Sequence, residues 1–208
     1  MKKFLTFVAL QPPKQLHLTE YIPQDNEELK CGRKVHYPIS ILLETYAKKD
    51  EDVELLCIVS EDNEDVKQNL KTLKDEVADV EQDNGFRCKI TELMISQEQY
   101  IKDHLDTFSK LIQQIEDGDD LYVCCTYGTK PIPIVEMMAL NFAYQTKRNV
   151  SIKSVVYGML MRENGEVVGT GLYDITALFF MTQIVNRMAE QKVKNPEDMI
   201  RSILDLED

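Results

Sequence analysis

The sequence predicts an α/β protein built on a doubly wound, mostly parallel β-sheet, with a β-hairpin and a helix towards its carboxyl end. Segments with the apolar content of buried strands alternate with segments whose apolar residues have helical spacing. The strand segments are almost continuously apolar, as expected where helices cover both faces of a parallel sheet. The pair Asn164-Gly165, between two strand-like segments, predicts the hairpin turn.

The first half of the chain supplies three strand–helix pairs. We expect strands at 3–10, 53–60 and 86–95, helices at 38–49, 63–85 and 97–116, and an irregular polar segment with a small hairpin at 15–34. Pro12 ends the first strand, and Asn84-Gly85 is a typical end of a helix. Ser96 and Gln99 have the spacing of a capping box, which predicts the start of the third helix.

The second half continues the alternation. We expect strands at 120–126 and 150–158, a helix at 131–147, the hairpin, a helix at about 175–191 and a short helix near 196–205. No repeat or low-complexity linker interrupts this order, so we predict one Rossmann-like domain over 1–192. Residues 193–208 are predicted to be a short helical segment that could lead into a further domain. Ligands of such domains bind beyond the carboxyl ends of the strands.

The chain is acidic, with a formal net charge of -12. Its acidic residues concentrate at 48–54, 60–65, 116–120 and 205–208. Such runs are typical of solvated faces and turns. They argue against binding of long nucleic acid, which depends on basic patches. A short anionic ligand in a local pocket remains compatible with this charge.

We predict a cytoplasmic protein with no membrane partner, because no apolar run is long enough to span a bilayer. The first residues resemble a core strand more than a signal peptide, since they lack a cleavage site of small residues. The cysteines show no CxxC or zinc spacing, and we expect reduced, mostly buried thiols and no metal or cofactor. They are Cys31, Cys57, Cys88, Cys124 and Cys125.

The stretch "YVCCTYGTKPIP", residues 122–133, joins the most apolar strand to a helix. Thr126 and Thr129 supply hydroxyls, Gly128 allows a close approach of backbone to ligand, and Lys130 supplies a positive charge. Pro131 suits the first turn of a helix, whose free backbone N–H groups favour phosphate. The alternative is a simple turn in which Gly128 permits the bend and Lys130 lies in solvent.

Other catalytic patterns are weak. His17, His36 and His104 are scattered, and no metalloprotease motif or nucleophile elbow occurs. "GTGLYD" begins like a dinucleotide fingerprint but lacks the third glycine, and no Walker-type phosphate loop is present. Asp174 and Thr176 are interpreted as a helix N-cap.

Three stretches together, "CCTYGTKPIPIVEMMALNFA", "SIKSVVYGML" and "GLYDITALFFMTQIVNRM", closely resemble the CARF (CRISPR-associated Rossmann fold) domains of type III CRISPR ancillary effectors. The resemblance is strong over 120–190 and only topological over 1–118. The family pattern at the strand end is Asp/Asn, apolar, Ser/Thr, any, Gly, any, Arg/Lys. Residues 124–130 take these positions in turn, and Cys124 departs from the usual acidic or amide residue.

The resemblance implies a ligand, cyclic oligoadenylate, bound in the cleft of a two-fold dimer. In this family the ligand contacts the strand-end motif and the loop after the first strand, which corresponds to 9–12 here. The implied ligand-binding residues are Leu10, Gln11, Thr126, Tyr127, Gly128, Thr129, Lys130 and Pro131. The implied partners are the ligand and a second copy of the chain, as a homodimer or higher even oligomer.

Three functions follow from these observations. The first is a sensor domain that controls an effector in type III CRISPR antiviral defence. Such an effector would lie outside this chain, because 191–208 is too short for a nuclease or deaminase domain. The second is an enzyme, a metal-independent ring nuclease that opens the ring with its own ribose 2′-OH. The third is an unrelated nucleotide-binding Rossmann protein, for which a dinucleotide fingerprint would be expected.

Overall fold

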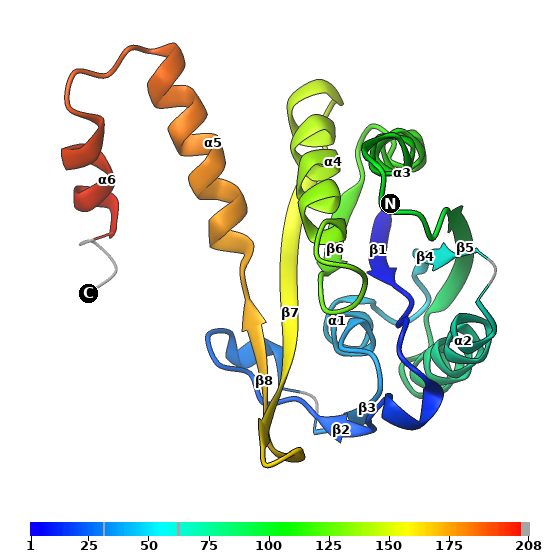
Figure 1. Ribbon diagram of the computed structural model, residues 1–208. Helices are drawn as coiled ribbons and strands as arrows, with labels where there is room; N and C mark the ends of the chain where they lie inside the picture. Colours follow the sequence, from blue (N-terminus) through cyan, green and yellow to red (C-terminus); the bar gives the residue numbers. More distant parts are fainter. Residues whose placement is uncertain (31, 62, 205–208) are drawn as a thin grey trace. The chain divides into compact units, whose positions relative to one another are not determined.

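The computed structural model describes residues 1–30, 32–61 and 63–204. Within them the predicted fold class is confirmed, since a six-stranded, mostly parallel sheet is covered by helices on both faces (Figure 1). The predictions for Cys31, for Asp62 and for the acidic run 205–208 fall outside the described residues.

The main sheet has the strand order β5-β4-β1-β6-β7-β8. Its strands are β1 (Lys2–Phe7), β4 (Asp52–Ser60), β5 (Arg87–Ile95), β6 (Asp120–Cys124), β7 (Ser151–Glu163) and β8 (Glu166–Asp174). All neighbouring pairs are parallel except β7 and β8. A two-stranded ladder, β2 (Thr19–Glu20) with β3 (Lys34–Val35), realises the small hairpin expected near 15–34, with a long connection between its strands.

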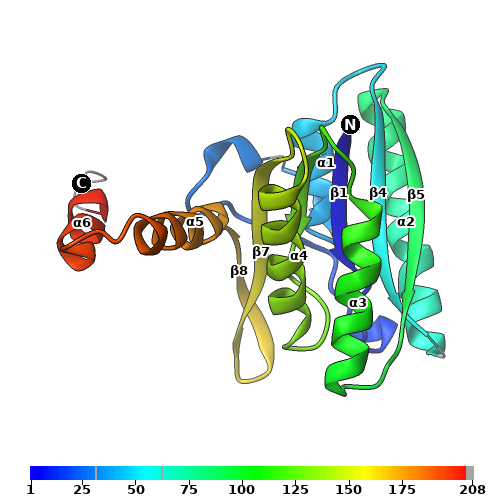
Figure 2. The ribbon, with the colours of Figure 1, turned by 90° about the horizontal axis from the view of Figure 1, so that it is seen from above.

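Figure 2 shows α1 (Ile39–Tyr46) and α2 (Glu64–Asn84) on one face of the main sheet and α3 (Ile101–Gln114) and α4 (Ile132–Thr146) on the other. Two short 3-10 helices, η1 (Pro13–Gln15) and η2 (Glu27–Leu29), interrupt the segment between β1 and β3. The chain then ends in α5 (Thr176–Glu190) and α6 (Pro196–Leu204).

Turn and cap residues explain several of the boundaries. Asn63 caps α2 by accepting a hydrogen bond from the Val66 N–H at 3.2 Å, and Gly85 ends the helix with a φ of 72°. Asn164 and Gly165 have φ values of 50° and 89° between β7 and β8, as a tight hairpin turn requires. The predicted C-cap and hairpin turn are therefore confirmed.

The predicted capping box at Ser96 is wrong. Its hydroxyl accepts a hydrogen bond from the Glu98 N–H at 3.1 Å, in a local turn directly after β5. The helix starts only at Ile101, and the preceding Tyr100 makes no side-chain cap. Serine and asparagine bond readily to backbone two residues ahead, so the same pattern can mark a loop instead of a helix start.

The order of strands reverses between β1 and β6. From β1 the chain passes through α1 and α2 to β4 and β5 on one side, and then returns through α3 to β6 on the other. The loops that follow β1 and β6 consequently run to opposite faces of the sheet and leave a crevice at its carboxyl edge. This crevice is the place where a doubly wound sheet binds ligands.

The opposite, amino edge of the sheet is closed by buried charges. The Lys3 ammonium lies 3.0 Å from the Asp119 carboxylate and 3.6 Å from that of Glu54, and all three side chains are buried. These buried, paired charges hold the amino ends of β1 and β4 and the residue before β6 in place. Function is therefore to be sought at the other edge.

The chain divides into two compact units, Met1–Thr176 and Ala177–Asp208, while the sequence-based division was placed at 192/193. In the second unit α5 and α6 flank an apolar groove of about 590 Å³. The apolar residues that line that groove include Val185, Met188, Val193, Pro196 and Ile200. Among the helices of the described ranges, none has the length and hydropathy that a bilayer crossing requires.

Candidate ligand-binding site

A cavity of about 90 Å³ opens at the carboxyl edge of the sheet. It lies where β1, β4 and β5 end and where the β6–α4 loop passes over them. Its lining residues are Phe7, Leu10, Ser60, Asn63, Ile95, Ser96, Gln97, Gln99, Thr129 and Ile132. Two of the residues predicted from the sequence, Leu10 and Thr129, thus meet in one cavity although they are far apart in the chain.

Gly128 lets the β6–α4 loop lie directly on the floor of this cavity. Its φ is 105°, a conformation that side chains rarely adopt. A Cβ atom at this position would lie 3.1 Å from Cγ of Phe7 and 3.2 Å from Cβ of Ile132. The neighbouring side chains of the protein thus require a glycine here, and a close approach of this backbone to a ligand stays a prediction.

The loop after β1 is held by Asn69, which the sequence reading missed. The side-chain amide of this buried residue on α2 donates hydrogen bonds to the carbonyls of Ala9 at 2.9 Å and Gln11 at 2.8 Å. The sequence contains an indication that Asn69 is buried, because Asn69 lies at helical spacing from the buried residues Val66 and Leu73. An amide on an apolar helix face needs buried hydrogen-bond partners.

Thr126 and Tyr127 turn away from the cavity. The Thr126 hydroxyl accepts a hydrogen bond from the Gly158 N–H at 2.8 Å, and so joins the loop to β7. The Tyr127 hydroxyl donates to the carbonyl of His36 at 2.7 Å, and its ring packs edge-on against Tyr37. Both side chains brace the loop, and neither lines the cavity.

The remaining predicted residues differ in their surroundings. Lys130 is exposed, and within the described ranges no residue pairs with it. Pro131 lies outside the cavity, in an apolar groove between α3 and α4 that Ile134 and Met138 also line. The Gln11 amide donates to the carbonyl of Gln15 at 3.4 Å. Lys130 is therefore available for a ligand, while Gln11 contributes its backbone to the loop.

Thr129 is notable for its hydroxyl group. Thr129 Oγ1 is buried, and none of the described residues offers it a hydrogen-bond partner. A buried hydroxyl without a partner is costly, and it calls for a water or ligand that completes its bonding. Because Thr129 lines the cavity, that partner is expected inside it.

A third group of lining residues was not expected from the sequence. Ser60 ends β4, Asn63 begins α2, and Ser96, Gln97 and Gln99 lie in the loop after β5. A signal existed for Ser60 and Asn63, which end and follow the strongly apolar segment 53–60, whereas the segment before Ser96 alternates between apolar and polar residues. Its interpretation required the strand order, which brings β4 and β5 beside β1.

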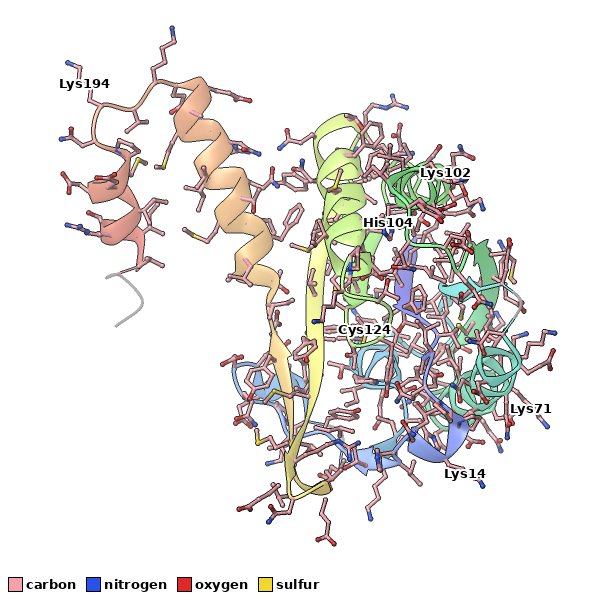
Figure 3. The ribbon with its side chains drawn as sticks, viewed as in Figure 1. Lys14, Lys71, Lys102, His104, Cys124 and Lys194 are labelled. Atoms are coloured by element: carbon pink, nitrogen blue, oxygen red, sulfur yellow. The ribbon has the colours of Figure 1, made fainter. Side chains whose placement is uncertain are left out.

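The three histidines lie apart from the cavity lining. His17 Nε2 is 2.9 Å from the guanidinium of Arg162 on the hairpin, and His36 Nδ1 is 3.1 Å from the carboxylate of Glu76. His104, on α3, lines the α3–α4 groove (Figure 3). None of the three contributes a side chain to the candidate site.

The adjacent cysteines belong to the core, as predicted. Burial raises the pKa of Cys124 to about 11 and that of Cys125 well above its ordinary value. Cys124 lies inside the domain (Figure 3), with its Sγ 3.1 Å from the Thr126 hydroxyl oxygen. Buried, protonated thiols are poor nucleophiles. The four described cysteines are free, and three of them are buried.

Glu136 on α4 is an ionisable residue that is buried beside the Cys125 thiol. It is 1% exposed, and neither of its carboxyl oxygens has a well-formed hydrogen bond within the described part of the chain. Burial raises its pKa to about 8, and the neighbouring Cys125 thiol offsets this only partly. Glu136 is therefore protonated near neutral pH.

Asp174 and Thr176 form hydrogen bonds at the start of α5, where the sequence predicts an N-cap. An oxygen of the Asp174 carboxylate accepts a hydrogen bond from the Thr176 N–H at 3.0 Å. The Thr176 hydroxyl in turn accepts one from the Val155 N–H at 2.8 Å, which ties the start of α5 to β7. The second Asp174 oxygen accepts from the Asn26 amide at 2.9 Å.

Comparison with known proteins gives one informative similarity. The chain is 30% identical over 126 residues to a CRISPR-associated protein of Methanocaldococcus jannaschii. The match covers 60% of this chain and 19% of the relative, so the chain spans about a fifth of the relative's length. No protein-family model matches the chain. The similarity supports the CRISPR association implied by the sequence motifs, and membership of the CARF domains remains a proposal.

Proposed function

We propose that the chain is a CARF-type sensor domain that binds cyclic oligoadenylate and controls an effector in type III CRISPR antiviral defence. The observation that carries this proposal is the meeting of Leu10 and Thr129 in one cavity, at the point where the strand order reverses. The two segments that the resemblance assigns to the ligand are thus neighbours in space. The similarity to a CRISPR-associated protein supports the same function.

The size of the cavity favours a ligand shared between two chains. Its volume of about 90 Å³ is well below the roughly 300–1,000 Å³ of pockets that enclose a whole small molecule. One chain would therefore hold only part of the ligand. A ring with internal two-fold symmetry fits a two-fold dimer, in which each copy presents the same surface.

The ring phosphates have two sources of attraction beside the cavity. The ammonium of Lys130 is exposed, and α4 begins two residues later, at Ile132. The helix dipole places partial positive charge at this start, which favours an anion. A local arrangement of this kind accepts a few phosphates even on an acidic protein.

The effector is proposed to lie in a longer polypeptide or in a separate partner. The relative is about five times as long as the region matched here, which leaves room in it for further domains. In this proposal, ligand binding in the dimer cleft changes the arrangement of the two copies relative to each other, and the attached effector responds to that change.

The proposal is tested by calorimetry with cyclic tri-, tetra- and hexa-adenylate. We expect saturable binding of at least one ring size, at one ring per two chains. Linear tri- and tetra-adenylate of the same composition serve as controls and should bind more weakly, because they lack the closed shape. Absence of binding for every ring would contradict the proposed function.

We further predict that the domain cuts the ring slowly or not at all. Opening a ring by attack of a ribose 2′-OH is accelerated by a general base. Among the described residues that line the cavity there is no histidine or carboxylate. The check is incubation of excess labelled ring and analysis for linear products with a 2′,3′-cyclic phosphate. Multiple turnovers within minutes, lost in a Lys130→Ala or His17→Ala variant, would establish a ring nuclease instead.

We also predict a two-fold dimer in solution. Large apolar side chains are exposed on α4 in the first unit and, separately, on α5 in the second unit, and exposed apolar surfaces of this kind mark interaction sites. Examples are Ile134, Met138, Leu178, Phe180 and Val185. Light scattering or sedimentation should give a mass near twice that of the chain, with or without ligand. A monomer at micromolar concentration under both conditions would rule this out.

A further inference from the structure

The described residues that line the 90 Å³ cavity are chemically neutral. The apolar ones are Phe7, Leu10, Ile95 and Ile132, and the polar ones carry hydroxyls and amides. Within the described ranges no charged side chain contributes to the lining. An anion would lose its hydration there without gaining an opposite charge.

The surroundings on the side of β4 and β5 are acidic. A hollow of about 230 Å³ shares Ser96 and Gln97 with the cavity, and its other lining residues are Glu61 and Glu98. Glu64 in the first turn of α2 adds a further negative charge. Phosphate groups would be repelled from this side, whereas Lys130 is outside the lining and exposed.

We propose that this cavity is a pocket for an adenine base of the ligand, read by Gln97 and Gln99 in the loop after β5. The inference rests on the proposed function and assigns the base to the neutral cavity and the phosphate to the side of Lys130. A purine has two apolar faces, which can pack against the apolar lining residues. Its edge carries hydrogen-bond donors and acceptors, which can pair with the amides and hydroxyls of the lining.

The hydrogen bonds of the two glutamine side chains determine which of their atoms can bind a ligand. The Gln97 amide nitrogen donates to the carbonyl of Glu61, and that of Gln99 donates to the carbonyl of Gln97 at 3.0 Å. Among the described residues neither glutamine's amide oxygen receives a hydrogen bond. A side-chain amide oxygen accepts from an amino group, and adenine carries such a donor at its six-position.

Thr129 supports the same assignment from the opposite wall. Its buried hydroxyl lacks a partner in the described part of the chain, and it can either donate or accept. A ring nitrogen of the base would satisfy it as an acceptor. Hypoxanthine carries a carbonyl oxygen in place of the amino group. This oxygen is an acceptor and would face the amide oxygens of the two glutamines, which are acceptors as well. The pocket should therefore select adenine over hypoxanthine.

The experiment measures the affinity of the whole chain for cyclic tetra-adenylate and for the same ring built from inosine. The wild-type chain should prefer the adenine ring by about tenfold or more, since each well-placed base contact discriminates by a similar factor. Gln97→Leu and Gln99→Leu should each lower adenine-ring affinity about tenfold and reduce the preference. Ser60→Leu, which fills the cavity, should weaken both rings.

Gln113→Leu is the matched control, because it makes the same change at an exposed position on α3 and should alter neither affinity. If Ser60→Leu fails to fold, the two surface glutamine variants decide the matter. Failure of the wild-type chain to bind any ring overturns the proposed function and this inference together. Normal ring binding with unchanged affinity and preference in the glutamine variants overturns the base pocket and leaves the sensor function standing.

Discussion

Replacing Lys130 by alanine is expected to lower the affinity for cyclic oligoadenylate by about tenfold to thousandfold or more and to leave the fold intact. A charge-assisted hydrogen bond to phosphate contributes about 1.5–3 kcal/mol, and a symmetric dimer would lose two of them. Lys130 is exposed, and no residue of the described ranges pairs with it, so its removal breaks no protein contact. Calorimetry with the ring that the wild type prefers measures the change.

Lys71→Ala is the control for the loss of one positive charge. Lys71 is an exposed residue of α2, at the periphery of the domain (Figure 3). Its removal changes the net charge by the same amount and should leave affinity nearly unchanged. Salt should weaken wild-type binding more than that of the Lys130 variant, because the lost contact is electrostatic. Equal affinity of wild type and Lys130→Ala would place the phosphates elsewhere.

The order of helices and strands could be predicted because its signals are local. The apolar strand segments, the Gly85 cap and the Asn164-Gly165 turn each depend on a few adjacent residues, and each is present in the structure. The carboxyl edge of the sheet could be predicted as the place of a candidate site for the same reason. Strand ends are visible in the sequence, and parallel strands place them together.

The walls of the cavity could not be predicted, because they depend on the order of strands in the sheet. Gln97 and Gln99 become neighbours of Thr129 only because β5 and β4 lie on the same side of β1. The directions of Thr126 and Tyr127 depend likewise on distant partners, the Gly158 N–H and the His36 carbonyl. Spacing in the motif places these residues in the loop without fixing where their side chains point.

Glu136 illustrates a signal that was present and not used. It stands in "PIPIVEMMALNFA", a helix that is apolar almost all round, so a charged residue there has a high chance of burial. Its burial raises its pKa to about 8 from the ordinary value of 4.5. A carboxyl group in this state links folding to pH in a direction opposite to that of an ordinary salt-bridged carboxylate.

The stability of the wild-type fold should therefore fall as pH rises from about 4.5 to about 8. In that range the folded chain keeps a proton on Glu136 that the unfolded chain has released, so unfolding is favoured by about 1.4 kcal/mol for each pH unit. Glu136→Gln keeps the shape of the side chain and removes the titration. Its stability should vary less with pH than that of the wild type, and it should exceed the wild type most clearly near pH 8.

Denaturant unfolding at pH 5, 6.5 and 8 measures the effect as the difference between the two proteins. The difference cancels the contributions of every other titrating group, because only Glu136 has changed. Glu163→Gln, at an exposed position on the hairpin, makes the same substitution outside the core and should follow the wild-type curve. Parallel curves for wild type and Glu136→Gln would mean that the Glu136 carboxyl is solvated in solution. Diverging curves would show that α4, whose first turn lies beside Thr129 and Lys130, packs on the sheet around a neutral carboxyl group.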